Sequence, residues 1–468
     1  MSVQIALLLL LFLSGCVTVN QQAAFRDISA AVEERGGIQP FWNSGTELDR
    51  EATEKIQSLL KEKLTVDAAV QIGLLNNRDL QAIYSDLGVA QADLIQAGLL
   101  KNPIFDAAIT FPRVGGRPDF ELTAVMNFLD VLYLPLRKRI AGARFEETKA
   151  RVTAAVIEFV ARVRNAFYVH QANEQLVEFR KTVVEALSAS FEAARRLHEA
   201  GNISDLDLMR HRAPVEGSKL ALRSSETAAA QSREQLSTLM GVWGEGTQWN
   251  IDNRLPDVPA PPPRDEALES VAIERSLDLA GARERIRAAG EQLGFTKWTA
   301  LLPDLGLGTR GERREGPWAV GPFLEVPLPF FDQGQGRRGR AAAELRRAQQ
   351  EYYALAVRIR SAARSTESQT RAASDRVLYY RDILLPLHER IVNEAQLQYN
   401  AMQLGVFELI RARDQQIEAA AGYVQALRDY WLARSDLEEL LSGSLPRSIP
   451  AQVGQRSGQT SSNVPEGH

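Results

Sequence analysis

A run of apolar residues at helical spacing is the feature that most restricts how this chain can fold. The spacing is 3.5 to 4 residues and continues for about 45 residues. At 1.5 Å per residue, a helix from about residue 138 to 198 would be roughly 90 Å long, far longer than a globular domain needs. The pattern therefore predicts elongated helical hairpins. Its members are Val152, Val156, Phe159, Val163, Phe167, Leu176, Phe179, Val183, Leu187, Phe191, Ala194 and Leu197.

The chain is also an internal repeat, with an offset of about 200 residues. A proline-rich linker at 256–264 separates the two halves. Each half is predicted to contain a helix, at about 65–98 and 265–298, then two short strands and a helical hairpin. The hairpins are predicted to turn at Gly201 and Gly405, because glycine can adopt a positive φ there. The corresponding residues are Asp79 and Leu80 with Asp278 and Leu279, Pro103 with Pro303, and Arg137 and Lys138 with Arg337 and Arg338.

The N-terminus resembles a lipoprotein leader. The apolar run from Ile5 to Leu13 suits a signal-peptide core and is too short to cross a bilayer. The sequence that ends it, "LSGC", resembles the lipobox of bacterial lipoproteins, which implies palmitate and other acyl chains on Cys16. Val17 follows where inner-membrane lipoproteins have Asp, and this favours the outer membrane. A cysteine within an ordinary signal or anchor segment is the alternative.

The predicted organisation follows from the leader, the repeat and the linker. The last 25 residues are rich in Ser, Pro, Gly and Gln and are expected to be disordered. The segments are a signal peptide at 1–15, a lipid-anchored segment at 16–63, a first repeat at 64–255, the linker at 256–264, a second repeat at 265–443 and the tail at 444–468.

Two pairs of short segments alternate apolar and polar residues, as strands of a transmembrane barrel do. The first pair covers 105–111 and 119–128, and the second covers 304–310 and 318–326. A half-buried sheet of a soluble domain would give the same alternation. Four strands cannot close a transmembrane barrel, since at least eight are needed. Two copies of the chain would supply eight strands, and three would supply twelve around a lumen wide enough for water.

At this point the sequence resembles the TolC family of outer-membrane efflux factors over about residues 60–443. The resemblance rests on the twofold repeat, on "NNRDLQA" and "AQADLIQAGLLKNPIF", and on "GPFLEVPLPFFDQGQGRRGRAAAE". The wording near the second strand pair is closest to the heavy-metal branch. The resemblance implies a mainly α fold with β: coiled-coil helical hairpins forming a periplasmic barrel, and four transmembrane strands that complete a 12-stranded β-barrel in a homotrimer.

The resemblance also implies partners and sites. The channel would be a passive duct in the cell outer membrane, extending into the periplasm and joined to a periplasmic adaptor protein and an inner-membrane transporter. Three acidic residues, Asp205, Asp207 and Asp414, are candidates for a periplasmic aperture, although a solvated helix face is an equally simple interpretation. The hairpin tips expected to contact the adaptor are Gly201, Asn202, Ile203 and Ser204, and Gly405, Val406, Phe407 and Glu408.

Other functions have less support in the sequence. Gly334, Gly336 and Gly339 have the G-x-G-x-x-G spacing of a dinucleotide site, but the prolines before them oppose a central parallel strand and no second strand follows. The net charge of −4 gives no case for nucleic acid. The five histidines have no metal-ligand spacing, no cofactor is expected, and no catalytic constellation indicates an enzyme. Type I protein secretion and a structural coiled-coil envelope lipoprotein remain as alternatives.

Overall fold

The computed structural model describes residues 21–447, apart from 44, 46, 112–116, 260–266, 302–304, 315, 328 and 329. The predicted signal peptide and Cys16 lie outside the described residues, as do most of the linker at 256–264 and most of the tail at 444–468.

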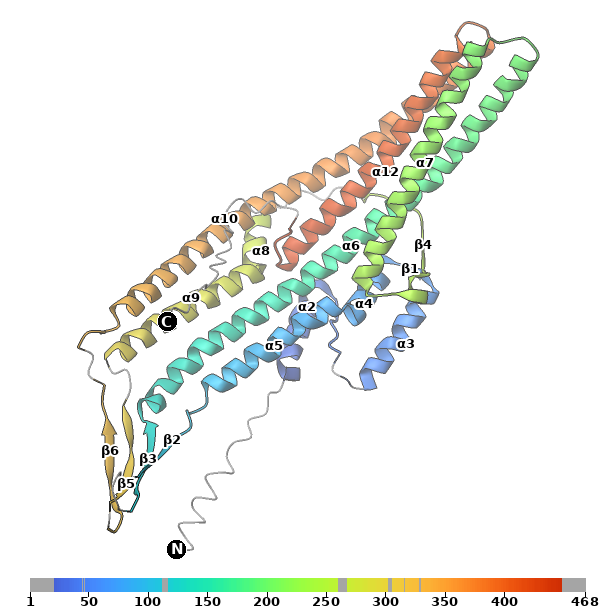
Figure 1. Cartoon of the computed structure of the whole chain (residues 1–468). Helices are drawn as coiled ribbons and strands as arrows, with labels where there is room; N and C mark the ends of the chain where they lie inside the picture. Colours follow the sequence, from blue (N-terminus) through green and yellow to red (C-terminus); the bar gives the residue numbers. More distant parts are fainter. Residues whose placement is uncertain are drawn as a thin grey trace, which may run out of the picture.

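The molecule is a long body of helices with a small sheet at one end (Figure 1). Helix α6 (Leu129–Glu199) contains 71 residues and runs from the sheet to the far end, where the chain turns back as α7 (Asp205–Met240). The expectation of a mainly helical fold with a small β part is confirmed. The second half repeats this path with α10 (Gln335–Tyr379), the π-helical η2 (Tyr380–Leu384), α11 (Leu385–Asn400) and α12 (Val406–Ser442).

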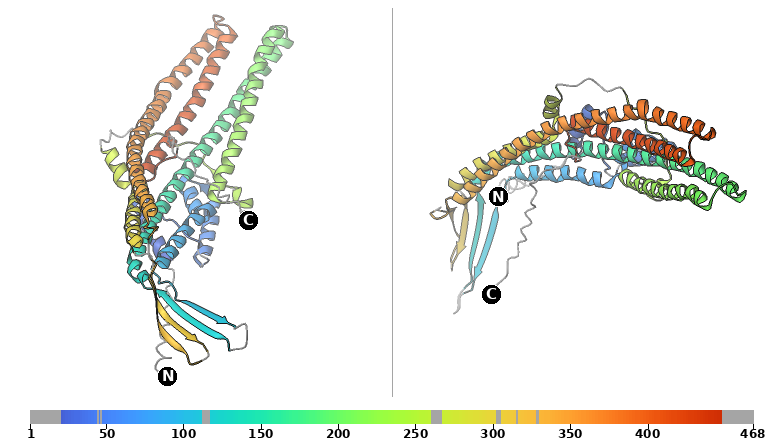
Figure 2. Two further views of the ribbon diagram at one scale, coloured as in Figure 1. Left: turned by 60° about the vertical axis from the view of Figure 1, so that its left-hand side comes forward. Right: turned by 90° about the horizontal axis from the view of Figure 1, so that it is seen from above.

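The long helices form one curved layer (Figure 2). Near the sheet, the order across the layer is α5 (Arg78–Ala97), α6, α9 (Leu277–Leu301) and α10. Toward the far end, the order is α7, α6, α12 and then α10 with α11. Helices α5 and α7 therefore form one edge of the layer, and α10 and α11 form the other.

The sheet is antiparallel, in the order β2 (Ile104–Thr110), β3 (Asp119–Asn127), β5 (Gly306–Arg313) and β6 (Ala319–Glu325). Leu122 pairs with Ala107 and with Gly311, which in turn pairs with Val320, so these residues share one face. This apolar face is uncovered within the chain. Its exposed large side chains are Phe105, Ile109, Leu122, Met126, Leu307, Val320 and Leu324.

The opposite face of the sheet is charged. The Nε atom of Arg310 lies 3.1 Å from a carboxylate oxygen of Glu121, and its guanidinium lies 4.3 Å from the ring centroid of Phe323. The register therefore separates an apolar face from a charged face. The carboxylates on the charged face are those of Asp106, Asp119, Glu121, Glu312 and Glu325.

A compact core lies on the flank of the helical layer. It is built from α2 (Gln21–Gly36), α3 (Glu47–Lys61), α4 (Val66–Asn76) and the parallel pair of β1 (Lys63–Leu64) with β4 (Asn250–Ile251). Helices α2 and α4 pack against α6, and α3 packs against α4. The largest fully buried side chains of this core include those of Trp249, Tyr84, Leu236 and Met240.

Arg35 of α2 joins this core to the second repeat. Its guanidinium donates hydrogen bonds to the carbonyl oxygens of Arg275 and Ser442. These are the last residues of α8 (Leu268–Arg275) and of α12. A cation at the C-terminus of a helix interacts favourably with the helix dipole and satisfies its terminal carbonyls. One side chain thus stabilises two helix ends.

The predicted helices at 65–98 and 265–298 are each broken in two. Asn77 and Ser276 adopt extended backbone conformations, with ψ of 119° and 115°. Each side chain accepts a hydrogen bond from a backbone N–H three residues later, Leu80 and Leu279. Continuous helices were therefore the wrong prediction, because both residues act as N-caps and start a new helix.

The glycine-rich junction lies between the antiparallel strands β5 and β6 and the start of helix α10. Gly334 is the N-cap of α10, with φ of 72°, whereas Gly336 and Gly339 lie inside the helix. A Cβ on Gly334 would approach the Cβ of Ala300 to 2.7 Å. The strand before the junction, β6, pairs antiparallel with β5. The parallel sheet of a dinucleotide fold is therefore not what precedes these glycines.

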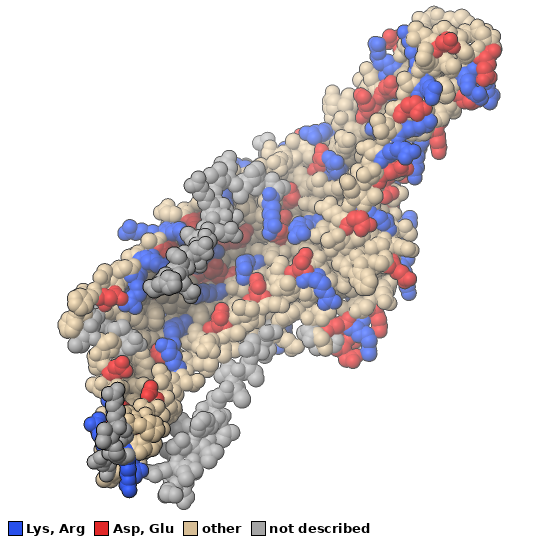
Figure 3. All heavy atoms as spheres, in the orientation of Figure 1, with Lys and Arg blue, Asp and Glu red and all other residues tan. Residues whose placement is uncertain are grey.

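On the face drawn in Figure 3, positive and negative side chains are interspersed along the helical body. Charged side chains of neighbouring helices also pair within the chain, as Arg285 of α9 does with Glu147 of α6 at 2.8 Å. Within the described ranges, no helix is both long enough and apolar enough to cross a membrane.

Candidate functional site at the hairpin tips

The first tip is a turn closed by glycine. After α6, the N–H of Gly201 donates to the carbonyl of His198 at 2.8 Å and the N–H of Asn202 donates to that of Leu197 at 2.9 Å. This is the Schellman arrangement, in which the turn residue is left-handed, and Gly201 has φ of 76°. Ser204 then caps α7, because its hydroxyl accepts the N–H of Asp207 at 3.2 Å.

The second tip has the same hydrogen bonds with different residues. The N–H of Met402 donates to Tyr399 at 3.0 Å and the N–H of Gln403 donates to Gln398 at 2.9 Å. The left-handed residue is therefore Met402, with φ of 58°. Gly405 has φ of −75° and ψ of 153°, and it is the N-cap of α12. The prediction that Gly405 supplies a positive φ was wrong, because it aligned Gly405 with Gly201 instead of with Ser204.

Each residue of the first tip has a counterpart 201 residues later in the second tip, as Met402 is the counterpart of Gly201. Ser204 and Gly405 are the N-caps. Asp207 and Glu408 follow at equivalent positions, and each pairs with an arginine three residues later. Asp207 lies 3.5 Å from Arg210, and Glu408 lies 3.6 Å from Arg411. Both tips therefore present a first helical turn with a carboxylate and a guanidinium.

One contact joins the two tips. The guanidinium carbon of Arg210 on α7 lies 4.2 Å from the ring centroid of Phe407 on α12. Phe407 is 38% exposed, so Arg210 covers part of an aromatic ring at the end of the molecule. Ile203, expected from the sequence as an exposed apolar residue, is half-buried. Phe407 and Arg210 together form a cation–π pair between segments that are 197 residues apart, the difference between 407 and 210.

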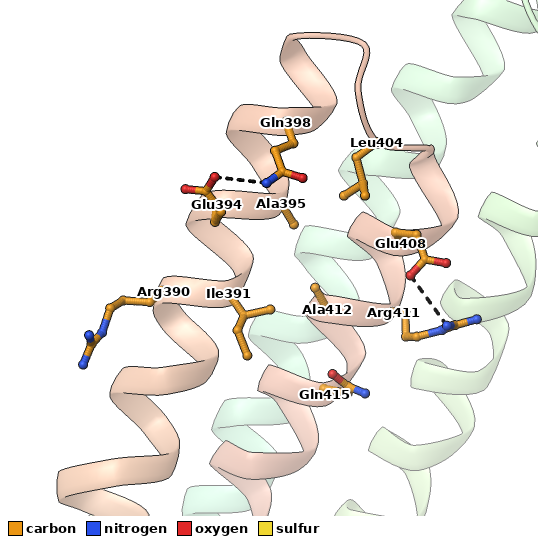
Figure 4. Close-up of a pocket in the computed structure, with 10 residues that line it drawn as sticks. All are labelled: Arg390, Ile391, Glu394, Ala395, Gln398, Leu404, Glu408, Arg411, Ala412 and Gln415. Atoms are coloured by element: carbon orange, nitrogen blue, oxygen red, sulfur yellow. Dashed lines mark hydrogen bonds and ion pairs between the residues drawn. The ribbon is translucent and has the colours of Figure 1, made fainter.

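A groove of about 480 Å³ lies between α11 and α12 beside the second tip (Figure 4). Ile391, Ala395, Leu404 and Ala412 give it an apolar floor. The rim is polar: Gln398 donates to Glu394 at 3.1 Å, and Glu408 pairs with Arg411. The lining residues are Arg390, Ile391, Glu394, Ala395, Gln398, Leu404, Glu408, Arg411, Ala412 and Gln415. An apolar floor with a charged rim suits a protein segment that lies along the groove.

The three aperture candidates are not brought together within one chain. Asp205 lies 2.8 Å from His198. The hydroxyl of Ser204, followed by Arg210, lowers the pKa of Asp207. Asp414 lies farther along α12, where desolvation, and then the neighbouring carboxylate of Glu418, raise its pKa. Asp205 and Asp207 thus belong to the first tip and Asp414 to the second hairpin.

Metal binding and acid–base chemistry are the other roles that His, Asp and Glu side chains could have. Within the part of the chain that the structure describes, no three His, Cys, Asp or Glu side chains gather as metal ligands. His170 is fully buried, its Nδ1 is 3.0 Å from the hydroxyl of Ser232, and burial lowers its pKa to about 4. It is a neutral core residue against Trp249, with ring centroids 5.1 Å apart.

Comparison with known proteins shows which class of protein this chain resembles. Residues 69–242 match the family model described as "Outer membrane efflux protein". This match, together with the relative that covers most of the chain and the shared fold described next, bears out the similarity of the chain to outer-membrane efflux proteins. The resemblance to the TolC family found in the sequence is confirmed, and the chain is an outer-membrane efflux channel component.

Two relatives show how far the similarity extends. The cobalt-zinc-cadmium resistance protein CzcC of Cupriavidus metallidurans is 24% identical over 388 residues, which is 81% of this chain and 90% of that protein. The probable efflux pump outer membrane protein TtgC of Pseudomonas putida is 27% identical over 195 residues, 38% of each chain.

Two solved structures share the fold. A crystal structure of CusC has a TM-score of 0.68 at 16% identity and covers 81% of this chain and 92% of that one. The outer membrane channel CmeC of Campylobacter jejuni has a TM-score of 0.65 at 16% identity and covers 88% of this chain and 91% of that one.

Proposed function

We propose that three copies of the chain close a 12-stranded β-barrel in the outer membrane, and that their helices continue it as a tunnel through the periplasm. The observation that carries this proposal is the sheet. Its outer strands, β2 and β6, each have one partner strand among the described residues. Its apolar face is exposed, with Phe105 78% and Val320 73% accessible, as a lipid-facing surface would be in an isolated chain.

The edges of the helical layer support closure by further copies. Exposed large apolar residues lie on both edges, whereas α9 and α12 expose such residues at their ends, Trp298 and Phe407. A head-to-tail interface joins two different edges, so a curved layer can close into a ring. One edge displays Val89, Leu206, Met209 and Leu220, and the other displays Tyr353, Val357, Tyr379, Ile383, Leu387, Ile391 and Leu397.

The N-terminal segment supports a lipid anchor. Cys16 in its lipobox-like context would carry acyl chains, and at about 0.8 kcal/mol per buried methylene several chains hold a protein firmly to a bilayer. The described chain starts at α2, whose Arg35 is fixed to the ends of α8 and α12. An anchor on Cys16 would thus lie 19 residues before a rigid attachment point, counting from 16 to 35.

The hairpin tips are proposed as the site where a periplasmic adaptor docks, which in turn joins an inner-membrane transporter that supplies the energy. The support is the groove between α11 and α12 and the repeated carboxylate and guanidinium pairs at both tips. Copies of Asp205, Asp207 and Asp414 would line the periplasmic aperture. The duct itself would be passive, with no cofactor and no catalytic residue.

The proposed cargo is cationic. The relative that matches most of this chain is named for resistance to cobalt, zinc and cadmium. The charged face of the sheet, which would line the barrel lumen, bears five carboxylates and the guanidinium of Arg310, and Arg314, just beyond β5, pairs with the carboxylate of Glu312 at 3.1 Å. A lumen with excess negative charge attracts cations.

Native mass spectrometry of the detergent-extracted protein tests the assembly and the anchor together. A trimer whose subunit mass includes acyl chains supports both. A monomer under all extraction conditions would leave the sheet open, and the envelope scaffold would replace the channel.

A further inference from the structure

We propose that α5 of one chain packs antiparallel against α10 of the next copy, with Tyr353 on Val89 and Arg346 beside Asp93. The inference rests on the trimer proposed above and specifies how its subunits fit together. It concerns the two edges of the helical layer near the sheet, where α5 and α10 are the outermost helices.

A line of ion pairs across the layer gives a common reference level. Asp86 of α5 lies 3.3 Å from Arg151 of α6, and Glu147 of α6 lies 2.8 Å from Arg285 of α9. Arg285 also lies 3.7 Å from Glu351 of α10. Glu147 and Glu351 are therefore at about the same distance from the sheet, and Asp86 is one helical turn, about 6 Å, farther away, at the level of Arg151.

The distance of each residue of α5 and α10 from the sheet can be counted from this reference level, because a helix rises 1.5 Å per residue. Helix α5 runs toward the sheet and α10 runs away from it. Val89 is thus about 1.5 Å farther from the sheet than Glu351, and Tyr353 is about 3 Å farther. Ser85 and Val357 are about 7.5 Å and 9 Å farther by the same count. Val89 and Tyr353 therefore differ by less than about 2 Å in their distance from the sheet, and so do Ser85 and Val357.

The surfaces at these levels fit each other. Tyr353 is 65% exposed, Val357 67% and Val89 63%. The exposed positions around Val89 on α5 are small and follow helical spacing: Ala82, Ser85 and Ala92. Small side chains let a neighbouring helix approach closely, so the large residues of α10 would fill the space above them.

The charges fit as well. Asp93 lies about 4.5 Å closer to the sheet than the reference level, and Arg346 about 7.5 Å closer. Both side chains are exposed, and neither forms an ion pair with another described residue. A carboxylate on one edge and a guanidinium on the other, about 3 Å apart in level, would form an intersubunit ion pair.

A lipid is not the occupant of these edges. Glu147 is 18 residues beyond the start of α6 at Leu129, which places the reference level about 27 Å from the sheet. The ion pairs at that level are also foreign to a hydrocarbon core. A second copy of the chain is the partner that offers both the matching charge and the matching shape.

Cysteine cross-linking tests this register, since Cys16 is the one natural cysteine. The double variant Val89→Cys with Tyr353→Cys, treated with a short bismaleimide, is expected to give covalent dimers and trimers on denaturing gels. Within one chain the two positions are three helix spacings apart, about 24–30 Å, so an internal link cannot form. Each single variant should remain monomeric, because a head-to-tail ring never places identical residues together.

The control pair is Val89→Cys with Leu397→Cys, because Leu397 is 63% exposed, as much as Val89, but lies about 66 Å farther along α10 and α11 than Tyr353. Native mass spectrometry of the same samples separates the two proposals. A native trimer without a link between positions 89 and 353 would overturn the register alone. A monomer would overturn the trimer and the register with it.

Exchanging the two charges gives a second, independent test of the proposed ion pair between Asp93 and Arg346. Asp93→Arg and Arg346→Asp should each lower the temperature at which the trimer dissociates in detergent, and the double exchange should restore it. Two single losses that add in the double variant would contradict the ion pair.

Discussion

Gly201 and Met402 occupy the same position in the two hairpin turns, with φ of 76° and 58°. A left-handed conformation costs glycine nothing, whereas it costs another residue about 1–2 kcal/mol. The second tip is therefore strained where the first is relaxed. Met402 is also 94% exposed, so its side chain does not compensate through packing within the chain.

The variant Met402→Gly should stabilise the second tip by about 1 kcal/mol, because it removes the strain without removing a contact. Hydrogen exchange of the amides at the end of α11 and the start of α12 should slow several-fold. Faster exchange there would mean that Met402 makes stabilising contacts that the strain argument omits.

A matched pair of alanine substitutions isolates the backbone effect. A Cβ on Gly201 or on Gly405 would meet no atom within 4 Å, so the two sites differ in φ and not in space. Gly201→Ala should therefore destabilise the first tip by about 1–2 kcal/mol, whereas Gly405→Ala should cost less, about 0.5 kcal/mol, because alanine is only a poorer N-cap than glycine. Equal effects in hydrogen exchange would refute this assignment.

Substitutions on the two faces of β3 should have opposite consequences for membrane assembly. Leu122→Asp places a charge on the apolar face, where arginine or lysine costs about 2–4 kcal/mol in the middle of a bilayer and aspartate somewhat less. Thr123→Asp, one residue later, places it on the charged face. Fractionation of outer membranes should recover the second variant and not the first. Normal assembly of Leu122→Asp would count against a lipid-facing surface.

Removal of the Arg210 guanidinium should loosen the connection between the two tips. Arg210→Ala removes a cation–π pair of about 0.5–1 kcal/mol, and we expect faster hydrogen exchange in the first turns of both α7 and α12. Arg411→Ala is the control, because Arg411 pairs with Glu408 at the equivalent position of the other tip. Protection of α7 that is the same in both variants would show that the contact with Phe407 carries no coupling.

The stability of the folded chain should depend on pH through Glu439. Burial raises the pKa of this carboxyl to about 8, from an ordinary value of 4.5, while the hydroxyl of Ser444 donates to it at 3.1 Å. The folded state holds a proton that the unfolded state releases, so this contribution is complete below pH 4.5 and declines as the pH rises toward 8, by at most about 1.4 kcal/mol per pH unit.

The variant Glu439→Gln should keep the hydrogen bond and lose this decline. Its thermal unfolding midpoint should exceed that of the natural chain by an amount that grows between pH 5 and pH 8. Glu438→Gln is the matched control, because its carboxylate is 43% exposed and pairs with Arg164 on the surface. Parallel pH profiles for the natural chain and Glu439→Gln would exclude a proton on Glu439.

The sequence predicted those parts of the fold that depend on periodicity. The spacing of Val152, Val156 and Phe159 indicated α6, and alternation located β2 and β3 to within one residue at each end. It missed the breaks at Asn77 and Ser276, because a capping residue inside an apolar pattern is indistinguishable from a tolerated polar one until the chain bends there.

The tips were located in the sequence but their conformations were not. Glycine is the residue expected at a positive φ, so Gly405 was matched with Gly201. The hydrogen bonds of the second turn instead place Met402 at the positive φ. The contact between Arg210 and Phe407 had no local signal at all, since it depends on how two hairpins lie against each other.

The capping of α8 and α12 by Arg35 has a consequence for the order of biogenesis. The side chain is among the first described residues to be made, yet its partners Arg275 and Ser442 follow 240 and 407 residues later. Helix α2 can pack against α5 and α6 once those helices are made, but Arg35 gains both of its hydrogen bonds only after nearly the whole polypeptide has crossed the inner membrane. A chain truncated before residue 442 would lose one of the two carbonyls that Arg35 binds, so the end of α2 would be held less firmly and would be more open to proteases that cut loosely held segments.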